Sequence, residues 1–466
     1  MDEKITEKLL GYLTNLKVED LSSEVIDKAK LCLLDTLGVA LAGSVTSIGE
    51  LARKYAISIG GREENTIYNY GDRVSCIPGS YANGTMAFSH NLTDTTLSCI
   101  VHCGPVIVPT ALSMAEKEGK SGKDVLAAMV AGYEMMTRIG NVINSGRARM
   151  SHHKRGFHAT ATTGVFGASL TASKLLNLNV DQMGDALGIA GSYASGLLES
   201  GIFPGTETWK THTGIAAQNG TSAALLAKLG LRGPSTILEG KQGFFSAFGE
   251  KDVDLMGMEE DLGKRFLILD SSFKLHNSAH VWAVPLDCLS KMAKRDQIRP
   301  EDVSEIKVII PTMYSYVMDE SKGSNYPENY AEAQNNLPYV MAAMMIHGAV
   351  FLDTFSESVL RDPRMKRMAS KVAIEIDPSL DEIFRGTDKS PAQVKVLLRS
   401  GKEVVEGADY PRGSPKNPAT KEEIERKFVD LAVTIFERQK ALEIIHIVNN
   451  IEKLNNVKEL IRHLIV

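Results

Sequence analysis

The sequence predicts a mainly α-helical protein, in which a large all-helical domain is built from both chain ends and a smaller α+β lid domain is inserted into it. Three observations predict this architecture. The 466 residues exceed what one hydrophobic core usually supports. Helical patterns dominate to about residue 265, and strand-like patterns follow before a helical pattern returns at 419–436. The predicted domains are therefore 1–268 and 406–466 for the helical part and 269–405 for the lid.

The helical domain is predicted from apolar spacing and from its small residues. Residues 21–43 show apolar spacing of three and four, with Ser22 or Ser23 able to cap the helix. The segment 106–140 divides at Gly119 to Gly122 into two helices, with Ser121 as a candidate cap of the second. Residues 160–199 and 212–230 are rich in Ala, Gly, Ser and Leu, which indicates closely packed helices.

The lid is predicted from runs of β-branched or alternating residues at 305–319, 371–378 and 392–407. Ser400-Gly401 predicts a hairpin turn in the last of these runs, and 328–360 is predicted to be helical. Tyr314 and Tyr316 would alternate on the first strand, so that only one of them faces a cleft. The segment YPRGSPKNPAT, 410–420, resembles a linker.

Composition excludes several classes of protein. A formal net charge of -5, with 43% hydrophobic and 23% charged residues, is typical of a globular protein and does not favour nucleic-acid binding. The N-terminus MDEKITEKLL lacks the apolar core of a signal peptide, which predicts a cytoplasmic protein. The apolar stretches 31–43 and 339–352 are too short to span a membrane, so no membrane association is expected.

Cysteine usage predicts neither a disulfide framework nor a metal site. The five cysteines are scattered along the chain. Cys99 and Cys103 flank His102, but this spacing is not that of a structural zinc site and no second cluster completes four ligands. Phosphate loops of the GxGxxG and GxxxxGK[ST] types are also absent, as are HExxH and GxSxG.

Polar segments in otherwise apolar surroundings carry the chemical signal. They are 83–96, 101–105, 151–164 with the run SHHKRGFHATATTG, 208–214 and 272–280. Gathered at one cleft, they would form a cationic pocket with imidazoles for proton transfer, as a multiply charged carboxylic acid requires. Each segment alone has a simpler explanation: a histidine in a polar loop is usually solvated, and Lys210 and Lys274 could lay their stems on neighbouring aromatic rings.

The order of these segments resembles the MmgE/PrpD family, which is named for 2-methylcitrate dehydratase and is similar in organisation to cis-aconitate decarboxylase and iminodisuccinate epimerase. Ten collinear pieces carry the resemblance over nearly the whole chain. They are LLDTLGVALAG, NGTMAFSHNLTDTT, HCGPVIVPTALSMAEKEGKSGKDVLAAMVAGYE, GFHATATTGVFGAS, ALGIAGSYASGL, WKTHTGIAAQNGTSAALLAKLGLRGP, LEGKQGFF, SFKLHNSAH, EAQNNLPYVMAA and PRGSPKNP.

The resemblance implies a helical domain with an α+β lid, a homodimer, and lyase or isomerase chemistry on small polycarboxylates without a metal or other cofactor. Carried over by position, it implies catalytic roles for a set of five residues and substrate binding by four others. The catalytic set is His102, His158, Lys210, Lys274 and Tyr314, and the substrate-binding set is Asn91, Asp94, Thr95 and His280.

The sequence also departs from the family pattern. Many relatives have an acidic run D-[FY]-D-D-T, where this chain has Asn91 and Thr93 at two of the acid positions and keeps Asp94. One residue is also inserted between Thr95 and His102. An amide cannot act as a base near neutral pH. Either other groups transfer the proton or the reaction differs from that of the best-known members.

These residues suggest one chemical scheme with three outcomes. Lysines would stabilise the enediolate-like charge that develops when a Cα proton is removed, one imidazole would act as base, and the other would protonate a departing hydroxyl. Dehydration is the preferred prediction. Reprotonation on the opposite face would give an epimerase, and loss of carbon dioxide would give a decarboxylase. A catalytically reduced, dimeric carboxylate-binding protein is the alternative from another class.

Overall fold

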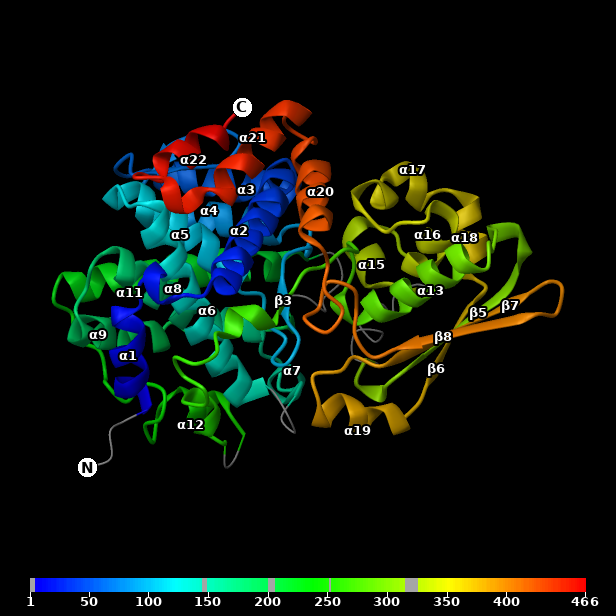
Figure 1. Cartoon of the computed structure of the whole chain (residues 1–466), viewed down its shortest axis with the longest axis horizontal. Helices are drawn as coiled ribbons and strands as arrows, with labels where there is room; N and C mark the ends of the chain where they lie inside the picture. Colours follow the sequence, from blue (N-terminus) through cyan, green and yellow to red (C-terminus); the bar gives the residue numbers. More distant parts are fainter. Residues whose placement is uncertain (1–4, 145–148, 200–205, 251–252, 315–325) are drawn as a thin grey trace. The chain divides into compact units, whose positions relative to one another are not determined.

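The chain divides into two compact units (Figure 1). The structure, a computed structural model, describes residues 5–144, 149–199, 206–250, 253–314 and 326–466. The larger unit comprises Met1–Ser200, Glu207–Ser271 and Thr420–Val466, and the smaller consists chiefly of Ser272–Ala419. The first division lies close to the predicted 268/269, and the second lies beyond the predicted 405/406. The segment 410–419 stays with the smaller unit because the Phe273 amide donates to the Gly413 carbonyl (3.0 Å).

The mainly α-helical prediction is confirmed, and helices form nearly all of the regular secondary structure described in the larger unit. These are α1 (Ile5–Asn15), α2 (Ser23–Ser44), α3 (Ser47–Ile59), α4 (Cys76–Phe88), α5 (Gly104–Glu118), α6 (Gly122–Asn144), α7 (Ser151–Lys154), α8 (Ala159–Leu175), α9 (Val180–Gly191), α11 (His212–Lys228), α12 (Phe244–Phe248), α20 (Lys421–Ala432), α21 (Arg438–Asn449) and α22 (Lys458–His463). Four strands of two residues each accompany them: β1 (Asn65–Thr66), β2 (Arg73–Val74), β3 (Thr95–Thr96) and β4 (Ser271–Ser272).

Local sequence signals set the helix ends. Ser22 caps α2, because its hydroxyl accepts a hydrogen bond from the Val25 amide. Gly119 ends α5 in the left-handed conformation at φ 64°. Ser121 precedes α6 and exchanges hydrogen bonds with Asp124, as in a capping box. The predicted break between the two helices is therefore confirmed.

Both ends of the chain build one core in the larger unit. Helix α8 packs against α5, α6, α9 and α11, and α20 and α21 pack against α2 (Figure 1). Small residues allow the close approach of these helices. A Cβ at Gly220 would lie 2.5 Å from that of Ala168, and a Cβ at Gly132 would lie 2.1 Å from Thr171 Oγ1.

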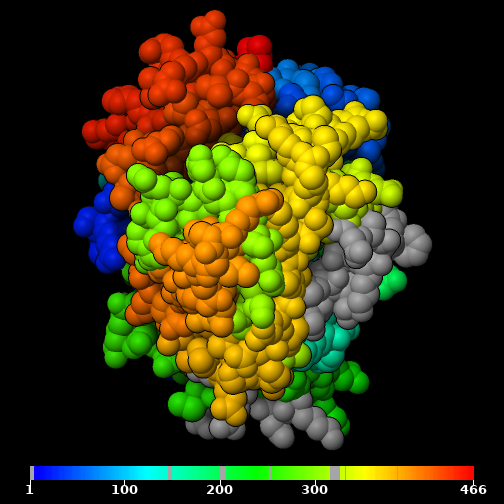
Figure 2. All heavy atoms as spheres, turned by 90° about the vertical axis from the view of Figure 1, so that its right-hand side faces the viewer, coloured from blue at the N-terminus to red at the C-terminus, as the bar shows by residue number. Residues whose placement is uncertain are grey.

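The smaller unit pairs helices with a four-stranded sheet of order β6-β5-β7-β8. The strands are β5 (Val303–Ile310), β6 (Val372–Ile376), β7 (Ala392–Leu398) and β8 (Glu403–Ala408). The helices are α13 (Ala283–Arg295), α15 (Tyr330–Asn335), α16 (Leu337–His347), α17 (Glu357–Leu360), α18 (Pro363–Ala369) and α19 (Ser379–Gly386). Figure 2 shows segments around 280–310 (yellow-green), 340–370 (yellow) and 390–410 (orange) side by side on this unit's surface.

Sheet pairing confirms the predicted hairpin and corrects one predicted strand. Strand β5 pairs parallel with β6 and antiparallel with β7, and β7 pairs antiparallel with β8 around Ser400-Gly401. Gly401 takes the positive φ (87°) that this tight turn needs. The strand predicted over 305–319 ends at Ile310, because Pro311 has no amide hydrogen for the sheet. Tyr314 lies instead in a 3₁₀ turn, Thr312–Tyr314, and Tyr316 lies outside the described residues.

Across the described ranges, no single helix is long and apolar enough to cross a membrane. Helices α2 and α3 meet the length and composition requirement only as a pair, and they are bent by 88° at the break between them.

Candidate active site

The ring of Phe88, at the end of α4, is the point where polar segments of the larger unit meet. Its centroid lies 5.0 Å from that of His102, 6.0 Å from that of His158 and 5.3 Å from that of Trp209. Phe88 itself is fully buried. The fold thus brings together four polar segments that lie up to about 130 residues apart in the chain. They are 83–96, 101–105, 151–164 and 208–214.

His102 is held through its Nδ1 atom. This nitrogen lies 2.8 Å from the Asp94 carbonyl and 3.0 Å from Thr95 Oγ1. A carbonyl oxygen only accepts hydrogen bonds, so Nδ1 carries the hydrogen and Nε2 carries the lone pair. The His102 amide donates to Thr160 Oγ1 (3.1 Å), which ties this loop to α8.

His158 is also held through Nδ1, by a second histidine. Its Nδ1 lies 3.0 Å from Nδ1 of His212, the first residue of α11. Burial and the neighbouring imidazoles, first that of His212, hold the pKa of His158 well below its ordinary value, and burial lowers the pKa of His212 to about 4. Both rings are therefore neutral near pH 7.

Lys210 is the buried cation of the larger unit's site. It lies in the 3₁₀ turn Thr208–Thr211, directly after Trp209, and is only 2% exposed. Its ammonium pairs with Glu207 at 2.8 Å, and Glu207 is itself 38% exposed. Burial and then Lys210 lower the pKa of His90 to about 4, so Lys210 also acts on the segment that precedes Asn91.

Asp94 is fully buried, and each of its carboxylate oxygens accepts a hydrogen bond from the protein. The Gly104 amide donates to Oδ1 and the Tyr133 hydroxyl donates to Oδ2, each at 2.9 Å. Burial, and next the nearby Asp35, raise the pKa of the Asp94 carboxyl to about 7. Asp94 thus fixes the start of α5 against α6, and its own carbonyl orients His102.

Asn91 occupies the turn between α4 and β3. It is 7% exposed and adopts a positive φ of 50°, a conformation that Asn tolerates better than most residues. Its backbone amide donates a hydrogen bond to the Phe88 carbonyl at 3.0 Å. Asn91 therefore has a clear backbone role in this turn.

Lys274, His280 and Tyr314 belong to the smaller unit. Lys274 is only 3% exposed. The ring of Tyr314 packs edge-on against Trp282 and Phe384, with centroids 6.2 and 5.5 Å apart. His280 begins the 3₁₀ turn His280–Trp282 that leads into α13.

Two of the polar or family-like segments, 272–280 and 330–336, are joined by hydrogen bonds in the smaller unit. The Gln334 amide nitrogen donates to Asn277 Oδ1 at 2.5 Å, and the Ala279 amide donates to the Gln334 carbonyl at 3.0 Å. Asn277 Nδ2 also donates to the Tyr330 hydroxyl at 3.1 Å. The segments 272–280 and 330–336 thus form one hydrogen-bonded cluster within the smaller unit.

The sequence did not single out several residues that shape the site. These are His212, Phe88, Trp209 and Tyr133. His212 stands two residues after Lys210 in a segment already marked as polar, and this was the available signal. Tyr133 lies in an apolar helix, where nothing in the local sequence separates it from a core residue.

No group of three or more His, Cys, Asp or Glu side chains suited to a metal ion occurs in the part of the chain that the structure describes. All five cysteines are free and buried.

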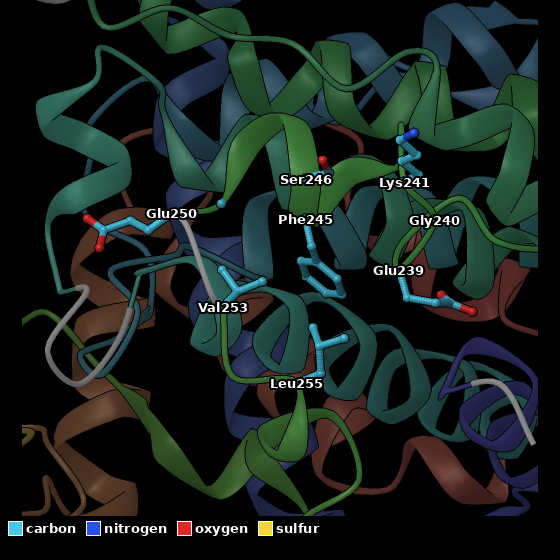
Figure 3. A pocket seen from close by; sticks show the side chains of 9 residues that line it. Glu239, Gly240, Lys241, Phe245, Ser246, Glu250, Val253 and Leu255 are labelled. Carbon is cyan, nitrogen blue, oxygen red and sulfur yellow. The ribbon is translucent and has the colours of Figure 1, made fainter. Parts of the chain in front are cut away.

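A surface pocket of about 460 Å³ lies elsewhere on the larger unit, lined by residues from Glu239 to Leu255. Figure 3 shows Phe245, Val253 and Leu255 extending into the same space, with the carboxylates of Glu239 and Glu250 pointing away. This pocket contains none of the predicted site residues, so the histidines, not the pocket, define the candidate site.

Comparison with known families gives two matches that together cover most of the chain. Residues 7–255 match the MmgE/PrpD N-terminal domain, and residues 276–453 match the MmgE/PrpD C-terminal domain. The chain belongs to the MmgE/PrpD family. Every predicted site residue except Lys274 lies within these matched ranges, and Lys274 lies in the gap between them.

Curated relatives of the chain are enzymes. Human cis-aconitate decarboxylase is 27% identical over 98% of this chain and 93% of its own length. The cis-aconitate decarboxylase of Aspergillus terreus is 25% identical, over 98% of this chain and 95% of its own length. The mitochondrial 2-methylcitrate dehydratase of Yarrowia lipolytica is 24% identical, over 88% and 80% respectively. The chain is thus an enzyme of this family.

Proposed function

We propose that this protein is a lyase of a small di- or tricarboxylic acid, and that it removes a Cα proton and expels hydroxide without a metal or other cofactor. One observation carries the proposal: His102 and His158 contact the same buried ring and are both held through Nδ1. In each ring Nε2 is the nitrogen left for proton transfer. Nε2 of such an imidazole can take the Cα proton, and the imidazolium so formed can then protonate the departing hydroxide.

The proton balance of dehydration follows from this arrangement. The Cα–H bond breaks and the proton bonds to Nε2 of one neutral imidazole, while the electron pair moves toward the adjacent carboxylate. The electron pair then forms the carbon–carbon double bond as the C–O bond breaks, and the hydroxide takes the proton from the imidazolium and leaves as water. Lys210 would stabilise the charge on the carboxylate, because a cation in a buried site acts more strongly than one in water.

Lys274 and Tyr314 are proposed to be catalytic residues, as the resemblance implies. Asn91, Thr95 and His280 are proposed to contact the substrate. For Asp94 the proposal is revised. Its carboxylate is fully buried and bonded to Gly104 and Tyr133, which favours a positioning role for His102 over direct substrate contact. A homodimer and a cytoplasmic location stay predictions.

Decarboxylation is the second candidate. This candidate is supported by the extent of the sequence matches. The matches to two cis-aconitate decarboxylases cover 98% of this chain, whereas the match to the Yarrowia dehydratase covers 88% of it. In that reaction the bond between carbon and a carboxylate breaks, carbon dioxide leaves, and a histidine must deliver a proton to the carbon. Low histidine pKa values in the free protein favour the base-first reaction, which is why dehydration ranks first.

A single experiment separates these reactions. The purified protein is incubated in deuterated water with citrate, 2-methylcitrate, cis-aconitate and amino-dicarboxylates, and products are followed by NMR. Loss of water with deuterium exchange at Cα would support the proposal, and release of carbon dioxide would favour the second candidate. Stereochemical inversion without elimination would indicate an epimerase. Binding of these acids with no exchange and no product would leave only a carboxylate-binding protein.

A further inference from the structure

The contact between His158 and His212 requires the two rings to differ in tautomer. Their Nδ1 atoms lie 3.0 Å apart, a hydrogen-bonding distance for two nitrogens, and the ring centroids lie 5.2 Å apart. Two like nitrogens bond only when one carries a hydrogen and the other carries a lone pair. Since both imidazoles are buried and neutral, one ring is protonated at Nδ1 and the other at Nε2.

Backbone packing fixes this pair in place. The His158 amide donates to the Gly196 carbonyl at 3.0 Å. Gly196 has a φ of 128°, and a Cβ there would lie 2.5 Å from Ala161 Cβ and 3.5 Å from His212 Nδ1. Glycine therefore lets this backbone approach the His212 ring closely while its carbonyl holds the His158 amide.

We propose that His212 is a positioning residue for His158: it accepts the Nδ1 hydrogen of His158 and so leaves Nε2 of His158 as the base. The inference rests on the proposed function and deepens it. When the Cα–H bond of the substrate breaks, the proton forms a bond to Nε2 of His158 and the electron pair stays on the substrate. The bond from Nδ1–H to His212 then becomes charge-assisted and stabilises the imidazolium.

The surroundings of His158 make such a partner necessary. The other titratable groups that act on it are His153 and His152 of α7 and His102 from the loop before α5. Each of them disfavours a positive charge on His158, as does burial. His212 also disfavours the charge as a nearby titratable group, but its Nδ1 lies 3.0 Å from Nδ1 of His158 and can accept the Nδ1 hydrogen of the imidazolium.

Kinetics of two His212 variants test this role. In His212→Asn the amide oxygen can take the place of Nδ1 as acceptor, whereas His212→Phe keeps the ring and loses the bond. We expect kcat for Cα proton exchange to fall about 10- to 100-fold in His212→Phe with KM nearly unchanged, and to recover in His212→Asn. The exposed His446, changed to Asn and to Phe, is the matched control. Equal kcat in both His212 variants and wild type would overturn the inference.

A second measurement does not depend on the substrate. Long-range ¹H–¹⁵N NMR of ¹⁵N-histidine-labelled protein reports which ring nitrogen carries the hydrogen, with signals assigned from His158→Gln and His212→Asn. A protonated Nδ1 in His158 and an unprotonated Nδ1 in His212 would support the inference, and any other combination would overturn it. If the wild-type protein exchanged no substrate, the proposed function would fail, while this spectrum would still decide the state of the pair.

Discussion

Replacing Lys427 with methionine should destabilise the larger unit strongly. Its ammonium, on α20, donates to Asp35 Oδ1 on α2 and to the Leu92 carbonyl, each at 2.6 Å. Lys427 is 4% exposed and Asp35 is 1% exposed. Methionine keeps most of the apolar stem but removes the charge and both hydrogen bonds. Breaking a buried ion pair from one side leaves the other charge uncompensated, which costs about 3–5 kcal/mol.

The cost should depend on pH in a defined direction. Burial already raises the pKa of Asp35 above its ordinary value, and removing the cation raises this pKa further. The native state then binds a proton that the unfolded state has released, so the variant's stability falls as pH rises from the unfolded pKa to the folded pKa. The difference from wild type should therefore be larger at about pH 8 than at about pH 5.

Urea unfolding followed by far-ultraviolet circular dichroism measures this loss. Lys421→Met, on the same helix, is the control, because Lys421 is 52% exposed and its pair with Glu425 spans 3.7 Å. It should change stability by no more than about 1 kcal/mol. The double variant Asp35→Asn/Lys427→Met should recover most of the loss. A Lys427→Met protein as stable as the Lys421→Met protein, or one whose deficit shrinks with rising pH, would refute the reasoning.

Three further predictions concern the site. His158→Ala should lower deuterium incorporation at the substrate Cα by about 10²–10⁴-fold, as measured by NMR, and His446→Ala should not; an unchanged rate would remove His158 from the mechanism. Tyr133→Phe removes a hydrogen bond that favours ionised Asp94, so the pKa of the Asp94 carboxyl should rise above about 7. A ¹³C NMR titration measures this pKa, and a lower pKa in the variant would contradict the described hydrogen bonds. Tyr314→Phe keeps the ring packed against Trp282 and Phe384, so the melting temperature should stay unchanged. Turnover should fall about 10²-fold or more, because the variant lacks the proposed catalytic hydroxyl. Full activity in this variant would exclude that role.

Local signals in the sequence were sufficient where one short segment decides the outcome. Ser22 and Gly119 set helix ends, and Ser400-Gly401 set a hairpin, because capping and turn geometry depend on a few adjacent residues. The prediction of a strand that includes Tyr314 was wrong, because Pro311 has no amide hydrogen for the sheet and β5 ends at Ile310.

The sequence by itself determined the mainly helical class, the inserted α+β segment and the order of the polar segments, since periodicity and motifs are properties of neighbouring residues. Only the tertiary structure decided which side chains meet. Lys427 and Asp35 are 392 residues apart, and His158 and His212 are 54 apart. No local pattern encodes such a contact, because the tautomer and pKa of a buried group depend on what the rest of the fold packs around it.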